Sequence, residues 1–402
     1  MTNYRKAVYQ ALLSCYREEG FLSQHLQEWK QKSDPSERDF HLAYEIAMGT
    51  VRYTWALDAI AKQLAKSGKL HLKLKEKILV RMALYQALYL DSMPLYAVAD
   101  QMVKLAKAVC HPRFIPFFNA LMHQLDGFTW EPPKSNSIED LSVRVSFPEP
   151  FVEWMLRDYG PDAESIMNNL NQVHPSMMRV RKGEIDLPVI YSSNMGAYVT
   201  CPDVKKWGQN SRVYIQNVTP GALIDKLSKG LPHPPTSILD MCAAPGGKTI
   251  ALHDAFPEAE LWANEKSPKR LETLKDNLKK YEINAHLSSE DGLEYSPSRH
   301  FDLIILDVPC SNTGVLSKKP EARLRLTEEH VDQLKDLQLR LLKHAAKFLK
   351  KDGQIWYMTC SILKDENEAL IRESGLQCIG EPITILPNKE GWDGGFGAAL
   401  RT

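Results

Sequence analysis

The sequence lacks the features that would place it in a specialised class of protein. It has no run of eighteen apolar residues, and its first twenty residues carry several charges in place of the apolar stretch of a signal peptide. It also has no internal repeat and no low-complexity tract. We therefore expect a cytoplasmic protein with no membrane partner.

Cysteine is scarce and scattered along the chain. None of the seven cysteines belongs to a Cys-x-x-Cys pair, which argues against a disulfide framework and against a structural zinc site. We therefore expect no metal. A lone cysteine is usually a buried apolar residue, and we expect this of Cys15, Cys110, Cys201 and Cys378.

The chain has no excess of charge, because 50 Lys and Arg balance 50 Asp and Glu. The distribution is uneven: residues 1–130 hold 17 basic against 12 acidic residues, a net of +5, which leaves 33 against 38, or −5, for the remainder. A basic stripe in the first part would attract phosphates, although charge alone favours a solvated helix face. The stripe comprises Lys62, Lys66, Lys69, Lys73, Lys75, Lys77 and Arg81.

The length of 402 residues predicts two or three domains. Apolar residues recur at helical spacing through residues 1–128, which predicts an all-α bundle. The stretches with this spacing are 7–16, 40–61, 78–90, 95–109 and 115–125. A turn-rich linker follows, and then a small α+β connector at 138–230, with a helical segment around 151–170 and short strands at 178–181 and 197–200.

Residues 231–402 alternate strands with helices, which predicts a mainly parallel, Rossmann-like α/β sheet. We expect strands at 237–239, 261–263, 285–287, 301–306 and 354–358. One helix begins after Ser267 and runs to Lys280, and a second is capped by Thr327, continues through Lys351 and stops at Gly353. Ligands of such sheets bind beyond the carboxyl ends of the strands.

A glycine turn follows the first of these strands directly. It would let backbone N–H groups approach a ligand, and it comprises Cys242, Ala243, Ala244, Pro245, Gly246, Gly247 and Lys248. A phosphate-binding P-loop would need glycine where Cys242 stands, and a dinucleotide fingerprint would need three spaced glycines. Two interpretations of the turn remain: it binds a different nucleoside-bearing ligand, or it is only a structural turn.

Carboxylates follow four of the strands. They are Asp240, Glu265, Asp291 and Asp307, and Glu265 lies about twenty residues after the turn, where a carboxylate often binds ribose hydroxyls. Such an acidic rim suits a neutral or cationic ligand such as S-adenosylmethionine better than a triphosphate.

Two further cysteines directly follow strands on this rim, in Asp307-Val308-Pro309-Cys310-Ser311 and Thr359-Cys360-Ser361. A thiolate there could add to an electrophilic carbon. Carbon 5 of a pyrimidine needs such help, because it becomes nucleophilic enough to accept a methyl group only after a nucleophile adds to carbon 6.

These motifs resemble those of the NOL1/NOP2/Sun family of RNA cytosine-C5 methyltransferases, in its bacterial ribosomal RNA branch. The resemblance also includes Glu366-Asn367-Glu368, the segment 391–396 and helical segments that are similar to a NusB-like RNA-binding domain. It implies three regions: a NusB-like domain at 1–128, the connector at 138–230 and a methyltransferase domain at 231–402.

The resemblance also implies roles. Cys360 would attack carbon 6 of the cytosine, Cys310 would assist release of the product, and Asp307 would contact the base and the cofactor. Residues 242–248, Glu265 and Asp291 would hold S-adenosylmethionine. The substrate would be small-subunit (16S) ribosomal RNA, bound by the helical domain and by a Lys/Arg loop at 318–323, and the protein would be a monomer that does not act on DNA.

Some residues depart from the family pattern. Asn312 stands where Gly or Ala is usual, Val308 replaces Ala, Asn217 replaces Asp, and residues 318–323 lack the usual Arg-His-Pro form. Three alternatives remain open: the same reaction on transfer RNA, a non-catalytic RNA-binding or ribosome-assembly factor, and a P-loop ATPase, which Cys242 and the acidic rim disfavour.

Overall fold

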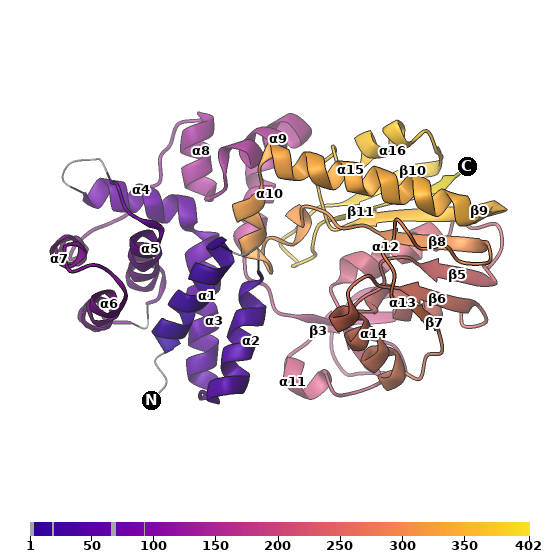
Figure 1. Ribbon diagram of the computed structural model, residues 1–402, viewed down its shortest axis with the longest axis horizontal. Coiled ribbons are helices and arrows are strands. Elements are labelled where there is room, and N and C mark those ends of the chain that lie inside the picture. Colours follow the sequence, from indigo (N-terminus) through magenta and orange to yellow (C-terminus); the bar gives the residue numbers. More distant parts are fainter. Residues whose placement is uncertain (1–3, 18–19, 66–69, 92) are drawn as a thin grey trace. The chain divides into compact units, whose positions relative to one another are not determined.

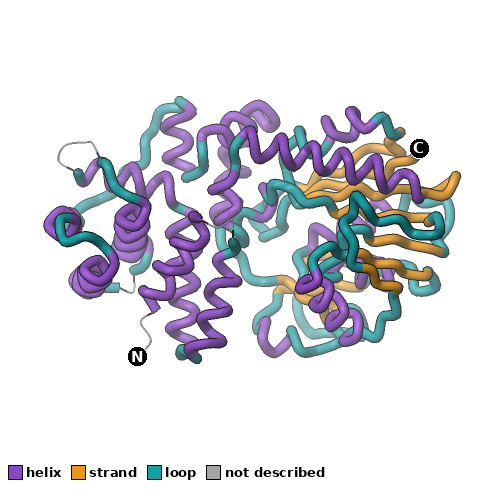
Figure 2. Tube along the Cα trace, in the orientation of Figure 1, coloured by secondary structure: helices purple, strands orange, loops and turns teal. Residues whose placement is uncertain are grey.

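The computed structural model describes residues 4–17, 20–65, 70–91 and 93–402. The chain divides into two compact units, of which the first comprises Met1–Asn171 with Leu316–Leu326 and the second Gln172–Val315 with Thr327–Thr402 (Figure 1). We call them the helical unit and the sheet unit. All strands among the described residues lie in the sheet unit (Figure 2).

The helical unit confirms the predicted α-helical fold of the first part of the chain. Its helices are α1 (Tyr4–Arg17), α2 (Leu22–Ser33), α3 (Glu37–Arg52), α4 (Thr54–Leu64), α5 (Leu74–Tyr89), α6 (Leu95–Val109), α7 (Phe114–Gln124), α8 (Ile138–Val145), α9 (Glu149–Tyr159) and α10 (Ala163–Asn171). Nine consecutive residues of α5, from Ile78 to Gln86, are buried, so this helix forms the centre of the bundle. The stretch 40–61 contains two helices, because the chain leaves helical geometry at Tyr53.

The basic stripe is only partly a surface feature. Lys62, Lys73, Lys75 and Lys77 are exposed, whereas Lys66 and Lys69 lie outside the described residues. Arg81 is buried and pairs with Asp58 at 2.7 Å, so its inclusion among phosphate-binding candidates was wrong. Arg81 is therefore part of the core of the bundle.

Residues 316–326 form part of the helical unit and include the 3-10 helix η3 (Pro320–Arg325). Arg323 is fully buried there, and its guanidinium donates hydrogen bonds to the carbonyls of Arg52 and Ser146. Glu321 is also buried and accepts from the backbone N–H of Leu22 at 3.1 Å. The prediction that the whole Lys/Arg loop contacts RNA is therefore wrong for Arg323, whereas Lys318 and Lys319 are exposed.

The sheet unit contains a seven-stranded sheet in the order β10-β11-β9-β8-β5-β6-β7. Its strands are β5 (Ser237–Asp240), β6 (Glu260–Asn264), β7 (His286–Ser288), β8 (Phe301–Asp307), β9 (Leu349–Thr359), β10 (Gln377–Ile385) and β11 (Gly395–Arg401). β5 to β9 pair in parallel, and β11 runs antiparallel to β9 and β10. The sheet confirms the predicted Rossmann-like fold and adds an antiparallel edge that the sequence did not predict.

Helices cover both faces of this sheet. One apolar core joins it to α12 (Val218–Ser228), α13 (Gly247–Ala255) and α14 (Pro268–Lys280), and the other joins it to α15 (Glu328–Ala345) and α16 (Glu368–Ser374). The helix predicted to run through Lys351 ends at Ala345, and β9 begins at Leu349. Local periodicity was misleading here because Leu349 pairs with Phe301 of β8.

A second, antiparallel sheet has the order β2-β3-β1-β4. Its strands are β1 (Met177–Val180), β2 (Val189–Ser193), β3 (Gly196–Thr200) and β4 (Val213–Ile215), and the short helix α11 (Val204–Trp207) precedes β4. The compact units therefore divide the stretch 138–230 after Asn171, with α8 to α10 on one side and this sheet on the other. The division into three functional domains stays a prediction.

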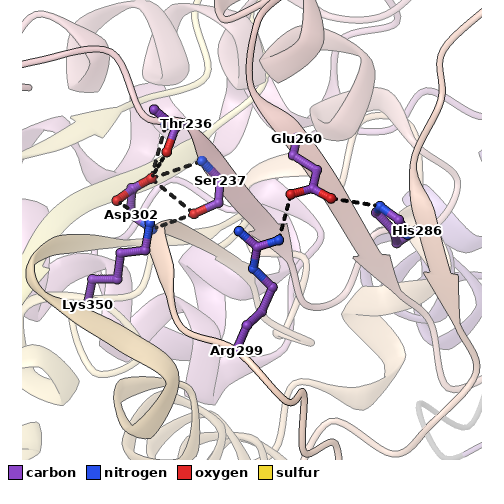
Figure 3. Close-up of polar contacts among 7 residues, drawn as sticks. All are labelled: Thr236, Ser237, Glu260, His286, Arg299, Asp302 and Lys350. Carbon is purple, nitrogen blue, oxygen red and sulfur yellow. Dashed lines mark hydrogen bonds and ion pairs between the residues drawn. The ribbon is translucent and has the colours of Figure 1, made fainter.

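Asp302, near the beginning of β8, links the beginnings of β5 and β9 to its own strand (Figure 3). Its Oδ2 accepts hydrogen bonds from the backbone N–H groups of Thr236 and Ser237 at 3.0 and 2.9 Å and from both hydroxyls, and its Oδ1 lies 2.9 Å from Lys350 Nζ. Partial burial raises the pKa of Asp302, but the hydrogen bonds outweigh it and hold that pKa well below the usual value. Glu260 makes a similar link to His286 and Arg299.

We predict that Asp302→Ala lowers the free energy of unfolding by about 1–3 kcal/mol near neutral pH, because several hydrogen bonds to a charged group are lost. The pKa of Asp302 is lower in the folded protein than in the unfolded protein, where it is about 3.9. The ionised carboxylate therefore stabilises the fold fully above about pH 3.9, and this contribution falls at lower pH as the carboxylate is protonated. Urea unfolding from about pH 7 towards about pH 3 should therefore show a shrinking difference from the unaltered protein. Asp332→Ala, on the exposed face of α15, is the control; a difference independent of pH would contradict the prediction.

Candidate active site

The glycine turn connects β5 to α13 at the carboxyl edge of the sheet. Gly246 has a φ of 104°, in the left-handed region that favours glycine, and a Cβ there would lie 2.8 Å from Leu274. A Cβ on Gly247 would lie 3.1 Å from the Gln216 amide nitrogen. The two glycines thus let the turn lie close against α14 on one side and the residues around β4 on the other.

A cavity of about 220 Å³ lies at this turn. Its lining includes most of the site residues that the sequence predicted. It also includes three residues that the sequence did not predict, two in β4 and one directly after it. The lining residues are Tyr214, Ile215, Gln216, Asp240, Cys242, Ala243, Ala244, Pro245, Gly247, Lys248 and Asp307. No sequence signal marked the contribution of β4, apart from the departure noted at the neighbouring Asn217.

Lys248 and Asp307 form an ion pair across this cavity, with Nζ 2.6 Å from Oδ2. Burial lowers the pKa of Lys248, but the charge and hydrogen bond of Asp307 outweigh it and raise that pKa above its usual value. The negative charge of a Cys360 thiolate acts in the same direction. Lys248 is thus a partly buried cation that can stabilise an anion on the cysteine loop.

Asp240 has a less favourable environment than the other carboxylates of the rim. Its Oδ2 accepts from the Thr249 hydroxyl at 2.6 Å, whereas its Oδ1 is buried without a hydrogen-bond partner among the described residues. Burial raises its pKa to about 6, against the opposing effect of Thr249. A buried acceptor at the wall of a cavity is available to a ligand that carries a donor.

Glu265 and Asp291 lie at the same edge but are not part of the cavity lining described above. Glu265 Oε1 accepts from the N–H of Ser267 at 2.9 Å, and its Oε2 lies 3.3 Å from Arg270. Asp291 pairs with Lys266 at 2.5 Å. With Asp307 also paired, the acidic rim predicted from the sequence is largely neutralised, so its net field is weaker than four carboxylates imply.

Cys310 and Cys360 lie on adjacent loops, because β8 and β9 are neighbouring parallel strands. Their sulfur atoms are 3.2 Å apart, and the Cys360 thiol also donates to the Asn312 side-chain oxygen at 3.4 Å. The hydrogen bond with Cys360, together with burial, raises the pKa of Cys310 well above its usual value. Neither cysteine is in the lining of the cavity described above, although Asp307 is and precedes Cys310 by three residues.

The other cysteines are only partly as expected. Cys15 and Cys201 are buried, whereas Cys110 and Cys378 are half-buried, so the expectation of burial was wrong for these two. Cys242 is half-buried in the glycine turn, and desolvation raises the pKa of its thiol. No cluster of metal-ligating side chains occurs in the described ranges, and none of the described helices is long and apolar enough to span a bilayer.

We predict that Asp240→Asn stabilises the ligand-free protein at high pH only. A folded-state pKa of about 6 lies above the unfolded value, so ionisation of this carboxyl costs stability as pH rises from about 4 to about 6. The variant should gain up to about 3 kcal/mol in unfolding free energy at about pH 8 and little at about pH 4. Thermal unfolding at both pH values, with the exposed Asp276→Asn as control, measures this; an equal gain at both would contradict it.

Two families match this chain. The 16S rRNA methyltransferase RsmB/F family matches residues 231–379, and the NusB family matches residues 2–126. The chain is 28% identical to ribosomal RNA small subunit methyltransferase B of Photorhabdus laumondii over 414 residues, which cover 92% of each chain. It is 26% identical to the protein of the same name from Klebsiella pneumoniae, over 99% of this chain and 98% of the relative.

Solved structures show the same fold. The crystal structure of PH0851 has a TM-score of 0.78 and 21% identity over 98% of both chains. The structure of NSun6 from Pyrococcus horikoshii with SFG has a TM-score of 0.56 and 19% identity over 63% of this chain and 98% of that one. These matches confirm the family resemblance inferred from the motifs: the chain contains a region of the RsmB/F methyltransferase family and a NusB-family region, which together indicate an S-adenosylmethionine-dependent RNA methyltransferase.

Proposed function

We propose that this protein methylates carbon 5 of a cytosine in small-subunit (16S) ribosomal RNA, with Cys360 as the covalent nucleophile. The observation that carries the proposal is the pair of thiols 3.2 Å apart at the carboxyl edge of the sheet, on loops next to the cavity that contains the glycine turn. A single reactive cysteine would suffice for addition to the ring. Two in contact suit a reaction in which one sulfur bonds to the base and the other assists its release.

The chemistry requires a change in the reactivity of the cytosine ring. The Cys360 thiolate forms a bond to carbon 6, which makes carbon 5 enamine-like and able to take the methyl group. A solvent water molecule then accepts the carbon 5 proton, the electrons of that C–H bond restore the ring double bond, and the bond between sulfur and carbon 6 breaks. Cys310 assists this last step, which regenerates the Cys360 thiolate.

The electrostatics of the two thiols support this assignment of roles. The pKa of Cys310 is raised by its hydrogen bond with Cys360 and by burial, so Cys310 is the thiol that stays protonated. The charge of Lys248 and that of a Cys360 thiolate stabilise each other. The position of Lys248 therefore favours Cys360 as the attacking sulfur.

The residues of the cavity fit S-adenosylmethionine, which supplies a methyl group on a sulfonium centre. The small residues of the turn leave room for a ligand near its backbone, and Asp240 offers a buried acceptor for a cationic or N–H group. Residues 242–248, Glu265, Asp291 and Asp307 would hold this cofactor. Asp307 would in addition contact the cytosine, because it lines the cavity and precedes Cys310 by only three residues.

The RNA substrate is proposed from two observations. The relatives over nearly the full chain are named ribosomal RNA small subunit methyltransferases, and the helical unit contains the NusB-family region. Exposed lysines of the helical unit can contact phosphates, and they include Lys62, Lys73, Lys75, Lys77, Lys318 and Lys319. These contacts would orient the RNA, and the flipped-out cytosine would be read in the catalytic pocket.

We predict that Cys360→Ala abolishes methyl transfer without unfolding the protein, and that Cys310→Ala accumulates a covalent protein–RNA adduct because release fails. Methyl transfer from labelled S-adenosylmethionine and a denaturing gel with 16S RNA measure the two effects. Cys378→Ala, on the edge strand β10, is the matched control and should behave like the unaltered protein. Turnover by a folded Cys360→Ala variant would refute the role of Cys360 as the nucleophile. The absence of an adduct with Cys310→Ala would refute the role of Cys310 in release.

We predict that methylation occurs in 16S RNA rather than in transfer RNA, because the NusB-family region would provide a separate RNA-binding surface. Incubation of the protein with both RNA pools, followed by nucleoside mass spectrometry, tests this and identifies 5-methylcytidine. Methylation of transfer RNA alone would overturn the substrate. Binding of RNA without methyl transfer would instead indicate a ribosome-assembly factor.

A further inference from the structure

A buried carboxylate joins the two cysteine loops. Glu366 lies between the Cys360 loop and α16 and is fully buried. Its Oε1 accepts from the backbone N–H of Ser311 at 2.9 Å and from the Gln338 side-chain amide at 2.8 Å. Its Oε2 accepts from the hydroxyls of Ser361, at 2.5 Å, and Ser311.

The donors to this carboxylate are the residues next to the two thiols. Ser311 follows Cys310 directly, and Ser361 follows Cys360 directly. One side chain therefore binds the loop after β8 and the loop after β9 at the points where each presents its cysteine. The distance between the two sulfurs, 3.2 Å, is consistent with such a link.

Buried groups behind the carboxylate hold it in place. The Gln338 amide of α15 also donates to the carbonyl of Pro309 at 2.9 Å, so it contacts the Cys310 loop a second time. The Tyr357 hydroxyl of β9 donates to the backbone carbonyl of Glu366 at 2.7 Å. The network thus spans β9, α15 and both loops, and the side chains that form it are buried.

The chemistry of the site requires a carboxylate here. Both oxygens of Glu366 accept from two donors each, and an ionised carboxylate is the side chain that provides only acceptors. Glutamine would present an N–H₂ group to two of these donors. No ion pair to Glu366 occurs among the described residues, so hydrogen bonds alone hold this carboxyl group in place.

We propose that Glu366 is a positioning residue that holds the Cys310 and Cys360 thiols in contact, so that attack and release take place on one ring. The proposal rests on the proposed function for its effect on catalysis. Its effect on the separation of the two thiols does not depend on that function. If the link is lost, the loops move independently, and turnover suffers while RNA affinity is retained.

The experiment compares Glu366→Gln with Glu373→Gln in the full chain. Glu373 is an exposed residue of α16, so its substitution changes the same charge without touching the network. The first readout is the rate at which diamide, which oxidises two thiols to a disulfide and is itself reduced, crosslinks Cys310 to Cys360, followed by peptide mass spectrometry. The second is kcat and KM for 16S RNA, and thermal unfolding checks that each variant is folded.

We expect Glu366→Gln to crosslink at least about tenfold more slowly and to lose about a hundredfold in kcat with little change in KM, because displaced reacting groups lower kcat. Glu373→Gln should match the unaltered protein in both readouts. A folded Glu366→Gln variant with the unaltered crosslinking rate overturns the proposal. If the unaltered protein crosslinks rapidly but transfers no methyl group to RNA, the proposed function fails and the crosslinking comparison still decides the role of Glu366.

Ser361→Ala is the second variant, because it removes one donor and leaves the carboxylate in place. It should show a smaller decrease in crosslinking rate and kcat than Glu366→Gln. If Glu366→Gln does not fold, this variant decides alone: a slower crosslinking rate supports the proposal, and an unaltered rate overturns it.

Discussion

The parallel alignment of β5, β8 and β9 is the constraint on which the proposed site depends. β8 lies between the other two, and its residues Leu303 to Leu306 are fully buried on both faces. Each such side chain contributes about 1.5–3 kcal/mol on burial, so separation of β8 from its neighbours is strongly disfavoured. Because parallel strands end at one edge, Asp240, Asp307 and Cys360 lie at that edge, and Cys310 follows on the loop after β8.

The balance of charge at this edge follows from burial. A carboxylate away from water needs a cation or several hydrogen-bond donors, and the structure provides one or the other in most cases. Asp307 has Lys248, Glu265 has Arg270, and Glu366 has four donors. Asp240 is the exception, since one of its oxygens is buried without a partner among the described residues and its pKa is raised. The group with the least favourable environment lies in the wall of the cavity, where a ligand can provide the missing donor.

The segment 316–326 stands in the sequence between two parts of the sheet unit, but it belongs to the helical unit. It follows Cys310 closely in sequence, yet its charged residues Glu321 and Arg323 are buried in the helical unit. A buried arginine that donates to carbonyl groups, without a carboxylate among the partners described above, is costly to place and difficult to remove. The segment therefore has a structural role in that unit.

The sequence alone determined the features that depend on local pattern. Strand ends, the glycine turn and the two cysteine motifs were predictable, because a parallel sheet brings the carboxyl ends of its strands together wherever they occur in the chain. Only the tertiary structure decided the partners. Lys248 pairs with Asp307 across 59 residues, Glu366 binds Ser311 across 55, and Gln216, directly after β4, lines the cavity. Burial, which made Arg81 and Arg323 core residues, likewise depends on packing between elements far apart in sequence, and no local spacing encodes it.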